Sequence, residues 1–246
     1  MGPAADAFPS VDGADLPWIT VEQMRTVDRV AIELGLSLPR MMENAGGNLT
    51  AVARAMLGGG VGGRRIVVAA GPGGNGGGGM VAARRLAGSG ARVRVHLGVD
   101  PEALAPIPRE QYELLGAFGV PVETGASGME SCDLFIDALL GYSQTGAPRG
   151  GIAELVSTAG GARVLSLDVP TGLELASGDV LEPAITADAT MTLALPKEGL
   201  RSDGGRERAG ALYLADISIG AAVYEQLEIP YGAPFSHGPI VEIAGS

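Results

Sequence analysis

Two aspartates each stand directly after an apolar run, which is a position where a carboxylate can do chemistry. Asp137 follows residues 134–136, and Asp168 follows residues 163–167. In a parallel sheet the carboxyl ends of the strands meet at one edge, and ligands bind there. A carboxylate that a ligand partly shields from water has a pKa suited to proton transfer. We predict a ligand site containing both residues, although an Asp at a strand end also serves as a cap for the next loop.

A glycine-rich segment carries the second chemical signal. Eight of the nine residues from 71 to 79 are Gly or Pro, the exception being Asn75, and a helical pattern begins at Met80. A strand, a glycine-rich turn and a helix in this order point free backbone N–H groups at an anion, and glycines let the ligand approach the backbone. The spacing matches neither Gly-x-Gly-x-x-Gly nor a Walker A loop, and a plain connecting turn is the alternative.

More polar residues follow the other apolar runs. Residues 141–146 come after the run that ends at Asp137, and Lys197 comes after the run at 189–195. The candidate substrate-binding residues are those of the glycine segment and of the strand ends: Gly74, Asn75, Gly76, Gly77, Gly78, Gly141, Tyr142, Ser143, Gln144, Thr145, Gly146, Ala147 and Asp168.

Alternating strands and helices must position these residues. The apolar patterns predict strands at 65–70, 92–97, 134–138, 163–169, 189–195 and 211–215, and helices at 20–34, 39–57, 79–88, 108–117 and 150–158. The first of these helices opens with a predicted capping box from Thr20 to Gln23. Right-handed crossovers between such units give an α/β fold with a mainly parallel sheet. We expect one domain over residues 19–246, preceded by a loose, acidic and Pro-rich arm at 1–18.

The composition of the chain disfavours several kinds of binding partner and site. The chain of 246 residues carries a net charge of −11, which disfavours nucleic acid because such binding depends on Lys and Arg contacts with phosphates. No apolar run reaches the roughly 18 residues of a membrane span, so we expect no membrane partner. The single cysteine rules out an internal disulfide and fits a reducing, cytoplasmic location. Because the chain has only two histidines in addition to this cysteine, a transition-metal site is not expected.

Several motifs then form one ordered set. They are Met24-Arg-Thr-Val-Asp-Arg29, Met42-Glu-Asn-Ala-Gly46, the segment 71–79, Asp137-Ala-Leu-Leu-Gly141, Asp168-Val-Pro-Thr-Gly172 and Pro196-Lys-Glu-Gly-Leu200. In order and spacing this set resembles the YjeF N-terminal domain family, the NAD(P)H-hydrate epimerases, over about residues 20–220.

The resemblance implies a Rossmann-like three-layer α/β/α sandwich and an isomerase that interconverts the R and S epimers of hydrated NADH and NADPH. It implies a potassium ion bound by Asn75, Asp137 and Thr171, whose amide, carboxylate and hydroxyl oxygens suit an alkali cation. At Asp168 the resemblance and the strand-end position together favour a catalytic proton transfer, with ribose binding as the alternative. We also expect a separate ADP- or ATP-dependent dehydratase as partner, and a homodimer.

Three positions depart from the family's pattern. Gly74 and Gly78 stand where the loop Gly-x-Gly-Asn-Asn-Gly-Gly-Asp-Gly has Asn and Asp, and Tyr142 stands where Gly-Thr-Gly has Thr. Two further hypotheses therefore stay open beside an active epimerase. One is a turnover-deficient nucleotide-binding or scaffold module of the same fold, and the other is an epimerase-like enzyme that acts on another small molecule.

Overall fold

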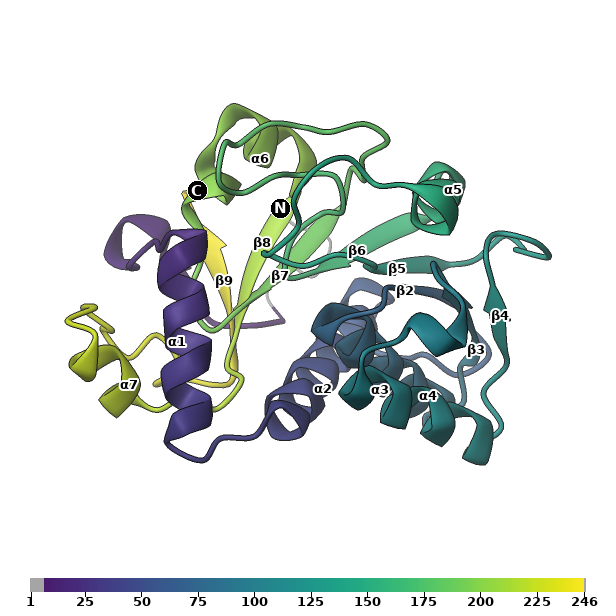
Figure 1. Cartoon of the computed structure of the whole chain (residues 1–246), viewed down its shortest axis with the longest axis horizontal. Coiled ribbons are helices and arrows are strands. Elements are labelled where there is room, and N and C mark those ends of the chain that lie inside the picture. The colour runs from purple at the N-terminus through teal and green to yellow at the C-terminus, as the bar shows by residue number, and fades with distance from the viewer. Residues whose placement is uncertain (1–6, 246) are drawn as a thin grey trace.

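The computed structural model describes residues 7–245, and in that part of the chain nine strands form one sheet. The strands are β1 (Ser10–Asp12), β2 (Arg65–Ala70), β3 (Arg92–Leu97), β4 (Val122–Thr124), β5 (Leu134–Ala138), β6 (Arg163–Leu167), β7 (Ala189–Leu193), β8 (Ala211–Ala215) and β9 (Ile240–Ala244). The helices are α1 (Val21–Glu33), α2 (Leu38–Met56), α3 (Gly74–Gly88), α4 (Pro106–Ala117), α5 (Gly150–Thr158), α6 (Asp203–Arg208) and α7 (Ala221–Gln226). Helices α2, α3 and α4 lie on one side of the sheet, with α5 and α6 on the other (Figure 1).

Alternating residues of the central strands bury both faces of this sheet. On β2, Val68 and Ala70 pack in the cluster formed with α2 and α3. Val67 and Ala69 point the other way and pack with Leu155 of α5. Since both faces are covered, these strands are continuous apolar runs rather than alternating ones. The expected three-layer α/β/α sandwich is confirmed.

The order of the strands places a switch point beside β2. The sheet runs β1-β9-β8-β7-β6-β5-β2-β3-β4, and the pairs of neighbouring strands are parallel except β8 with β9. From β2 the chain crosses to β3 and β4 on one side, and then returns to add β5 on the other. The crossovers therefore leave β2 and β5 in opposite directions, and this opens a crevice above their carboxyl ends.

The helix in the glycine-rich segment begins earlier in the chain than predicted. We expected a turn up to residue 79, whereas α3 begins at Gly74. Its glycines are buried because neighbouring groups occupy the space of a side chain: a Cβ on Gly77 would meet Cε of Met42 at 2.6 Å, and one on Gly79 would meet Cβ of Ala138. Close packing of α3 on α2 and the sheet therefore outweighs the low helix propensity of glycine.

The remaining differences concern the ends of elements and of the chain. The predicted strands 163–169 and 189–195 each end two residues early, at positive φ angles of 67° for Asp168 and 65° for Ala194. In the expected loose arm, residues 1–6 lie outside the described residues, and the rest contradicts the expectation. There β1 pairs in parallel with β9, and Nε1 of Trp18 donates to the carbonyl of Gly13 at 2.8 Å.

The other expected helices begin and end within two residues of their predicted bounds, and the Thr20 capping box is present. Between residues 7 and 245 there is no helix with the length and apolarity that a membrane span requires.

Candidate active site

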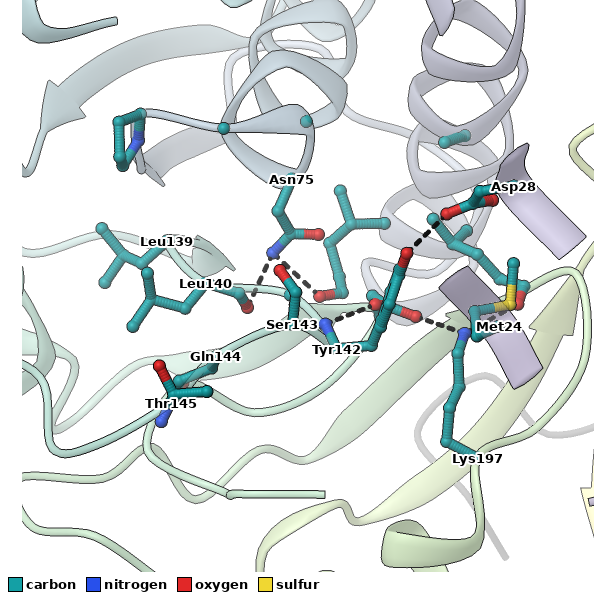
Figure 2. A pocket seen from close by; sticks show the side chains of 18 of the residues that line it. Met24, Asp28, Asn75, Leu139, Leu140, Tyr142, Ser143, Gln144, Thr145 and Lys197 are labelled. Carbon is teal, nitrogen blue, oxygen red and sulfur yellow. Dashed lines mark hydrogen bonds and ion pairs between the residues drawn. The ribbon is translucent and has the colours of Figure 1, made fainter. Parts of the chain in front are cut away.

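A cavity of about 730 Å³ lies at the carboxyl ends of β2, β5, β6 and β7, around the switch point. Its walls come from α1, from the start of α2, from the turn into α3 and from the loop that joins β5 to α5. Figure 2 shows the polar side chains that enter it from these elements. An active site is therefore expected at this place by the topology alone.

Two helix N-termini meet this cavity. Gly74 and Asn75 belong to the first turn of α3, and Arg149 is the N-cap residue of α5; all three line the cavity wall. The first backbone N–H groups of a helix have no partner within it, and the helix dipole adds positive potential. Arg149 is exposed and adds a positive charge to the cavity lining. Each of the two helix N-termini therefore suits an anion such as a phosphate.

Asn75, Asp137 and Thr171 are joined through one backbone unit, that of Leu140. Nδ2 of Asn75 donates to the carbonyl of Leu140 at 3.0 Å and to that of Leu167 at 3.1 Å. The Leu140 N–H donates to Oγ1 of Thr171 at 3.1 Å, and this hydroxyl donates to Oδ1 of Asp137 at 2.7 Å. The three residues predicted to hold an ion thus lie in one connected group.

The carboxylate of Asp137 is fully buried and has no basic partner in the described part of the chain. Its oxygens accept hydrogen bonds from the Leu139 and Thr171 N–H groups and from the hydroxyls of Ser166 and Thr171. Burial raises its pKa, while these hydrogen bonds favour the charged form. Asp137 forms no ion pair within residues 7–245. A buried carboxylate without a counter-ion, next to amide and hydroxyl oxygens, fits a monovalent cation.

Asp168 forms a buried ion pair that sequence reasoning did not predict. Nζ of Lys197 lies 2.6 Å from Oδ1 of Asp168, and the two side chains are 1% and 4% exposed. The ammonium also donates to Oγ1 of Thr192 at 3.2 Å and to the carbonyl of Leu193 at 2.8 Å. Three acceptors around one buried ammonium make this pair rigid, and both of its members line the cavity. The sequence signal for Lys197 is its place after the strand at 189–193.

Tyr142 connects Asp168 with a second carboxylate, that of Asp28. The Tyr142 N–H donates to Oδ2 of Asp168 at 2.9 Å, and its hydroxyl donates to Oδ2 of Asp28 at 2.6 Å (Figure 2). Burial raises the pKa of Asp28, and burial together with this carboxylate raises the pKa of Tyr142. Asp28, on α1, is the second residue that sequence reasoning missed, although it lies within the quoted motif 24–29.

The loop from β5 to α5 is held against the neighbouring loop. Oε1 of Gln144 accepts from the Gly172 N–H at 3.0 Å, and a Cβ on Gly141 would lie 3.3 Å from Oδ2 of Asp168. The sequence-predicted residues that line the cavity are Gly74, Asn75, Gly141, Tyr142, Ser143, Gln144, Thr145, Gly146, Ala147 and Asp168. The structure places Gly76, Gly77 and Gly78 inside the packed α3 helix, and Asp137 and Thr171 in the buried layer beneath the cavity.

Other described clusters do not offer a comparable centre. Within residues 7–245, no group of three or more His, Cys, Asp and Glu side chains is arranged to hold a metal ion. His96 is buried on β3, with Nδ1 at 2.9 Å from the carbonyl of Gly125.

Known proteins resemble this chain over almost its whole length. Residues 39–199 match the family described as YjeF-related protein N-terminus. An NAD(P)H-hydrate epimerase of Dehalogenimonas lykanthroporepellens is 40% identical over 244 residues, which cover 97% of this chain and 98% of that protein. A bifunctional NAD(P)H-hydrate repair enzyme Nnr of Thermofilum pendens is 36% identical over 83% of this chain and 41% of its own length. The crystal structure of yeast ynu0 shares the fold, with a TM-score of 0.77 at 24% identity, covering 93% of this chain and 100% of that one.

Proposed function

Since the chain belongs to the family of YjeF-related protein N-termini, we propose that it is an NAD(P)H-hydrate epimerase, an isomerase that interconverts the R and S epimers of hydrated NADH and NADPH. The observation that carries this proposal is the 40% identity to an epimerase, which extends over nearly all of both chains. The cavity agrees with it, because an anion-binding wall and a buried acid–base pair lie within one space.

Two parts of the substrate, its pyrophosphate and its hydrated nicotinamide ring, are assigned to two parts of the cavity. We place its phosphates at the N-termini of α3 and α5, near Gly74 and Arg149, where free N–H groups and positive charge meet. The hydrated nicotinamide ring then lies toward Asp168 and Lys197. The backbone of 141–147 forms the wall between them.

Asp168 is the proposed proton-transfer group. Epimerisation at C6 of the hydrated ring requires that the hydroxyl leaves and returns, or that the ring opens and closes, and both routes move a proton. The Asp168 side chain is 4% exposed at the end of β6 and held from two sides, by the Lys197 ammonium and the Tyr142 N–H. Such fixed orientation is what general acid–base catalysis needs.

A potassium ion bound by Asn75, Asp137 and Thr171 is part of the proposal. When bound, it supplies a positive charge that compensates the buried Asp137 carboxylate and ties the α3 turn to the loops after β5 and β6. We expect the melting temperature to rise in potassium salts relative to N-methylglucamine salts of equal ionic strength. The Asp137→Asn variant serves as control, since it should lose this difference. Equal melting temperatures of the wild type in both salts would argue against the ion.

The repair partner is proposed to be a separate ADP- or ATP-dependent dehydratase. The relative from Thermofilum pendens is named bifunctional, and this chain spans 41% of it. A cytoplasmic location and a homodimer are also part of the proposal. The single cysteine supports the reducing location, and size-exclusion chromatography with light scattering tests the dimer.

The decisive experiment uses purified protein and separated R and S hydrates of NADH and NADPH. We expect each epimer to convert to the same mixture, as seen by chromatography, faster than in a blank without protein. In a coupled assay with an S-specific dehydratase, the protein should allow complete consumption of an epimer mixture. Binding without conversion would instead favour the turnover-deficient module.

A further inference from the structure

Tyr142 forms hydrogen bonds with two carboxylates, one through its backbone N–H and one through its side-chain hydroxyl. Its backbone N–H is bonded to Asp168, which follows β6, and its hydroxyl is bonded to Asp28 on α1. All three residues line the cavity. The two carboxylates differ in their partners, since Lys197 forms its ion pair with Asp168, whereas Asp28 faces the phenol. In Figure 2 the Tyr142 hydroxyl reaches toward Asp28, and the Lys197 ammonium lies beside the ring, 5.8 Å from its centroid.

Epimerisation by loss and return of a hydroxyl uses both faces of the ring. The hydroxyl leaves C6 from one face, and the water that forms the other epimer adds from the opposite face. A proton must be given on the first face and taken up on the second. A single carboxylate reaches only one face of a bound ring, so inversion at C6 needs two acid–base groups.

We propose that Asp28, acting through the hydroxyl of Tyr142, is the second proton-transfer group of this site and serves the ring face opposite to Asp168. The inference rests on the proposed epimerase function and deepens it. The phenol of this relay comes from Tyr142, in the loop that joins β5 to α5.

The proton inventory of this step balances. When Asp28 is protonated, the hydrogen bond between the two side chains reverses, and the carboxyl donates to the Tyr142 oxygen. The phenol's own proton is then free to pass to the departing hydroxyl. The C6–O bond breaks, water leaves, and the ring nitrogen's electron pair forms a C6=N bond. A water on the other face then adds to C6, the electron pair returns to nitrogen, and the Asp168 carboxylate takes the released proton. The step leaves Asp28 ionised and Asp168 protonated. Asp168 then releases its proton to solvent and Asp28 takes one up, which readies both groups for the next turnover, and the reverse reaction uses the two groups with exchanged roles.

The surroundings of Asp28 support a proton-holding role. Burial raises its pKa, and so does the nearby Asp168 charge, while the Tyr142 hydrogen bond and the Lys197 charge oppose this. Burial raises the pKa of Tyr224 on α7, and the nearby Tyr231, Asp216 and Asp28 raise it further. The Tyr142 and Tyr224 phenols stay protonated near neutral pH, so the carboxyl is the group that changes its charge.

The test combines epimer conversion with oxygen exchange. Separated R and S hydrates are incubated in H₂¹⁸O with the wild type, with the Asp28→Asn, Tyr142→Phe and Asp168→Asn variants, and with a control, Glu33→Gln. Glu33 is exposed on the same helix and pairs with Arg29 on the surface, so Glu33→Gln should match the wild type. We expect Asp28→Asn to lose conversion by about 10²-fold or more, and Tyr142→Phe by at least about 10-fold.

Exchange without inversion distinguishes catalysis from a structural role. A single remaining group can still release and return water on its own face. Asp28→Asn should therefore exchange ¹⁸O into one epimer, and Asp168→Asn into the other. Near-normal conversion by Asp28→Asn, or loss of exchange into both epimers together, would overturn the inference. A wild type that changes neither epimer would overturn the proposed function, and this inference with it.

Discussion

At the scale of single residues, the candidate site depends on a buried pair of opposite charges. The Lys197 ammonium and the Asp168 carboxylate are both almost fully buried, 2.6 Å apart. Removing one member of such a pair leaves the other uncompensated, which costs more than the pair itself contributes. A substitution at Asp168 therefore changes stability as well as chemistry, and the two effects have to be separated.

The Asp168→Asn variant should lose epimerisation by about 10²-fold or more and also lose about 3–5 kcal/mol of unfolding free energy. In the double variant Asp168→Asn/Lys197→Met, part of that free energy should return because no unpaired ammonium is left, while activity stays absent. Urea unfolding of the wild type, both single variants and the double variant measures the coupling. Strictly additive losses would show that the pair does not behave as a unit.

Asp28 gives a pH dependence of stability with a defined sign. Because burial raises its folded-state pKa, the folded protein binds this proton more tightly than the unfolded chain does. The stability that this proton contributes is present below the ordinary carboxyl pKa and is lost as pH rises through the folded pKa. Asp28→Asn should therefore gain melting temperature relative to the wild type as the pH rises above the ordinary carboxyl pKa of about 4. A difference that does not change with pH would contradict the shift.

At the scale of elements, α3 shows why a run of glycines forms a helix here. A Cβ on Gly46 of α2 would lie 2.5 Å from Cβ of Val81 and 2.8 Å from the carbonyl of Gly78. A Cβ on Gly78 would lie 3.0 Å from Cδ2 of Leu167 and 3.8 Å from Cβ of Ala45. The two helices therefore approach closely, and the carboxylate that the family's pattern has at position 78 would enter apolar packing.

Two neighbouring glycines of α2 test this packing, because Gly46 lies at the close approach to α3 whereas Gly47 does not. Gly46→Ala should destabilise the protein by about 1–3 kcal/mol, because α2 and α3 must move apart. At Gly47 the new methyl group would only touch the Arg85 guanidinium at 3.6 Å, so Gly47→Ala should stabilise by about 0.5–1 kcal/mol through helix propensity. Denaturant unfolding of the two variants provides the measurement, and equal effects would contradict the close approach.

At the scale of the whole molecule, the two ends of the described chain meet on one edge of the sheet. Strand β1 pairs with β9, and Phe8 packs edge-on against Tyr213 of β8, with ring centroids 5.7 Å apart. This edge lies five strands away from β5, so it stabilises the sheet without lining the cavity.

Deletion of residues 1–15 should therefore lower the melting temperature, by about 2–4 °C for each kcal/mol lost. Epimerisation at 25 °C should persist, because the first cavity residue in the chain is Met24. Thermal unfolding and the epimer assay are run on the same preparation. Loss of activity with an unchanged melting temperature would reverse this assignment.

The sequence by itself determined the features that depend on neighbours along the chain. Apolar runs marked the central strands, and the capping box marked the start of α1. The residues after the strands, Asn75, Asp137 and Asp168, could be proposed as a site because parallel strands bring their carboxyl ends to one edge. Each of these signals lies within a few consecutive residues, and similar signals recur in successive strand–helix units of the fold.

Only the tertiary structure decided which distant residues meet. Lys197 lies 29 positions from Asp168, and Tyr142 lies 114 positions from Asp28, so no local pattern contains either pair. The helical state of Gly74–Gly79 was decided by the space between α2, α3 and the sheet, against the propensity of glycine. Burial and pairing are properties of the packed chain, and for that reason the partners of Asp168 and Asp28 appeared only in three dimensions.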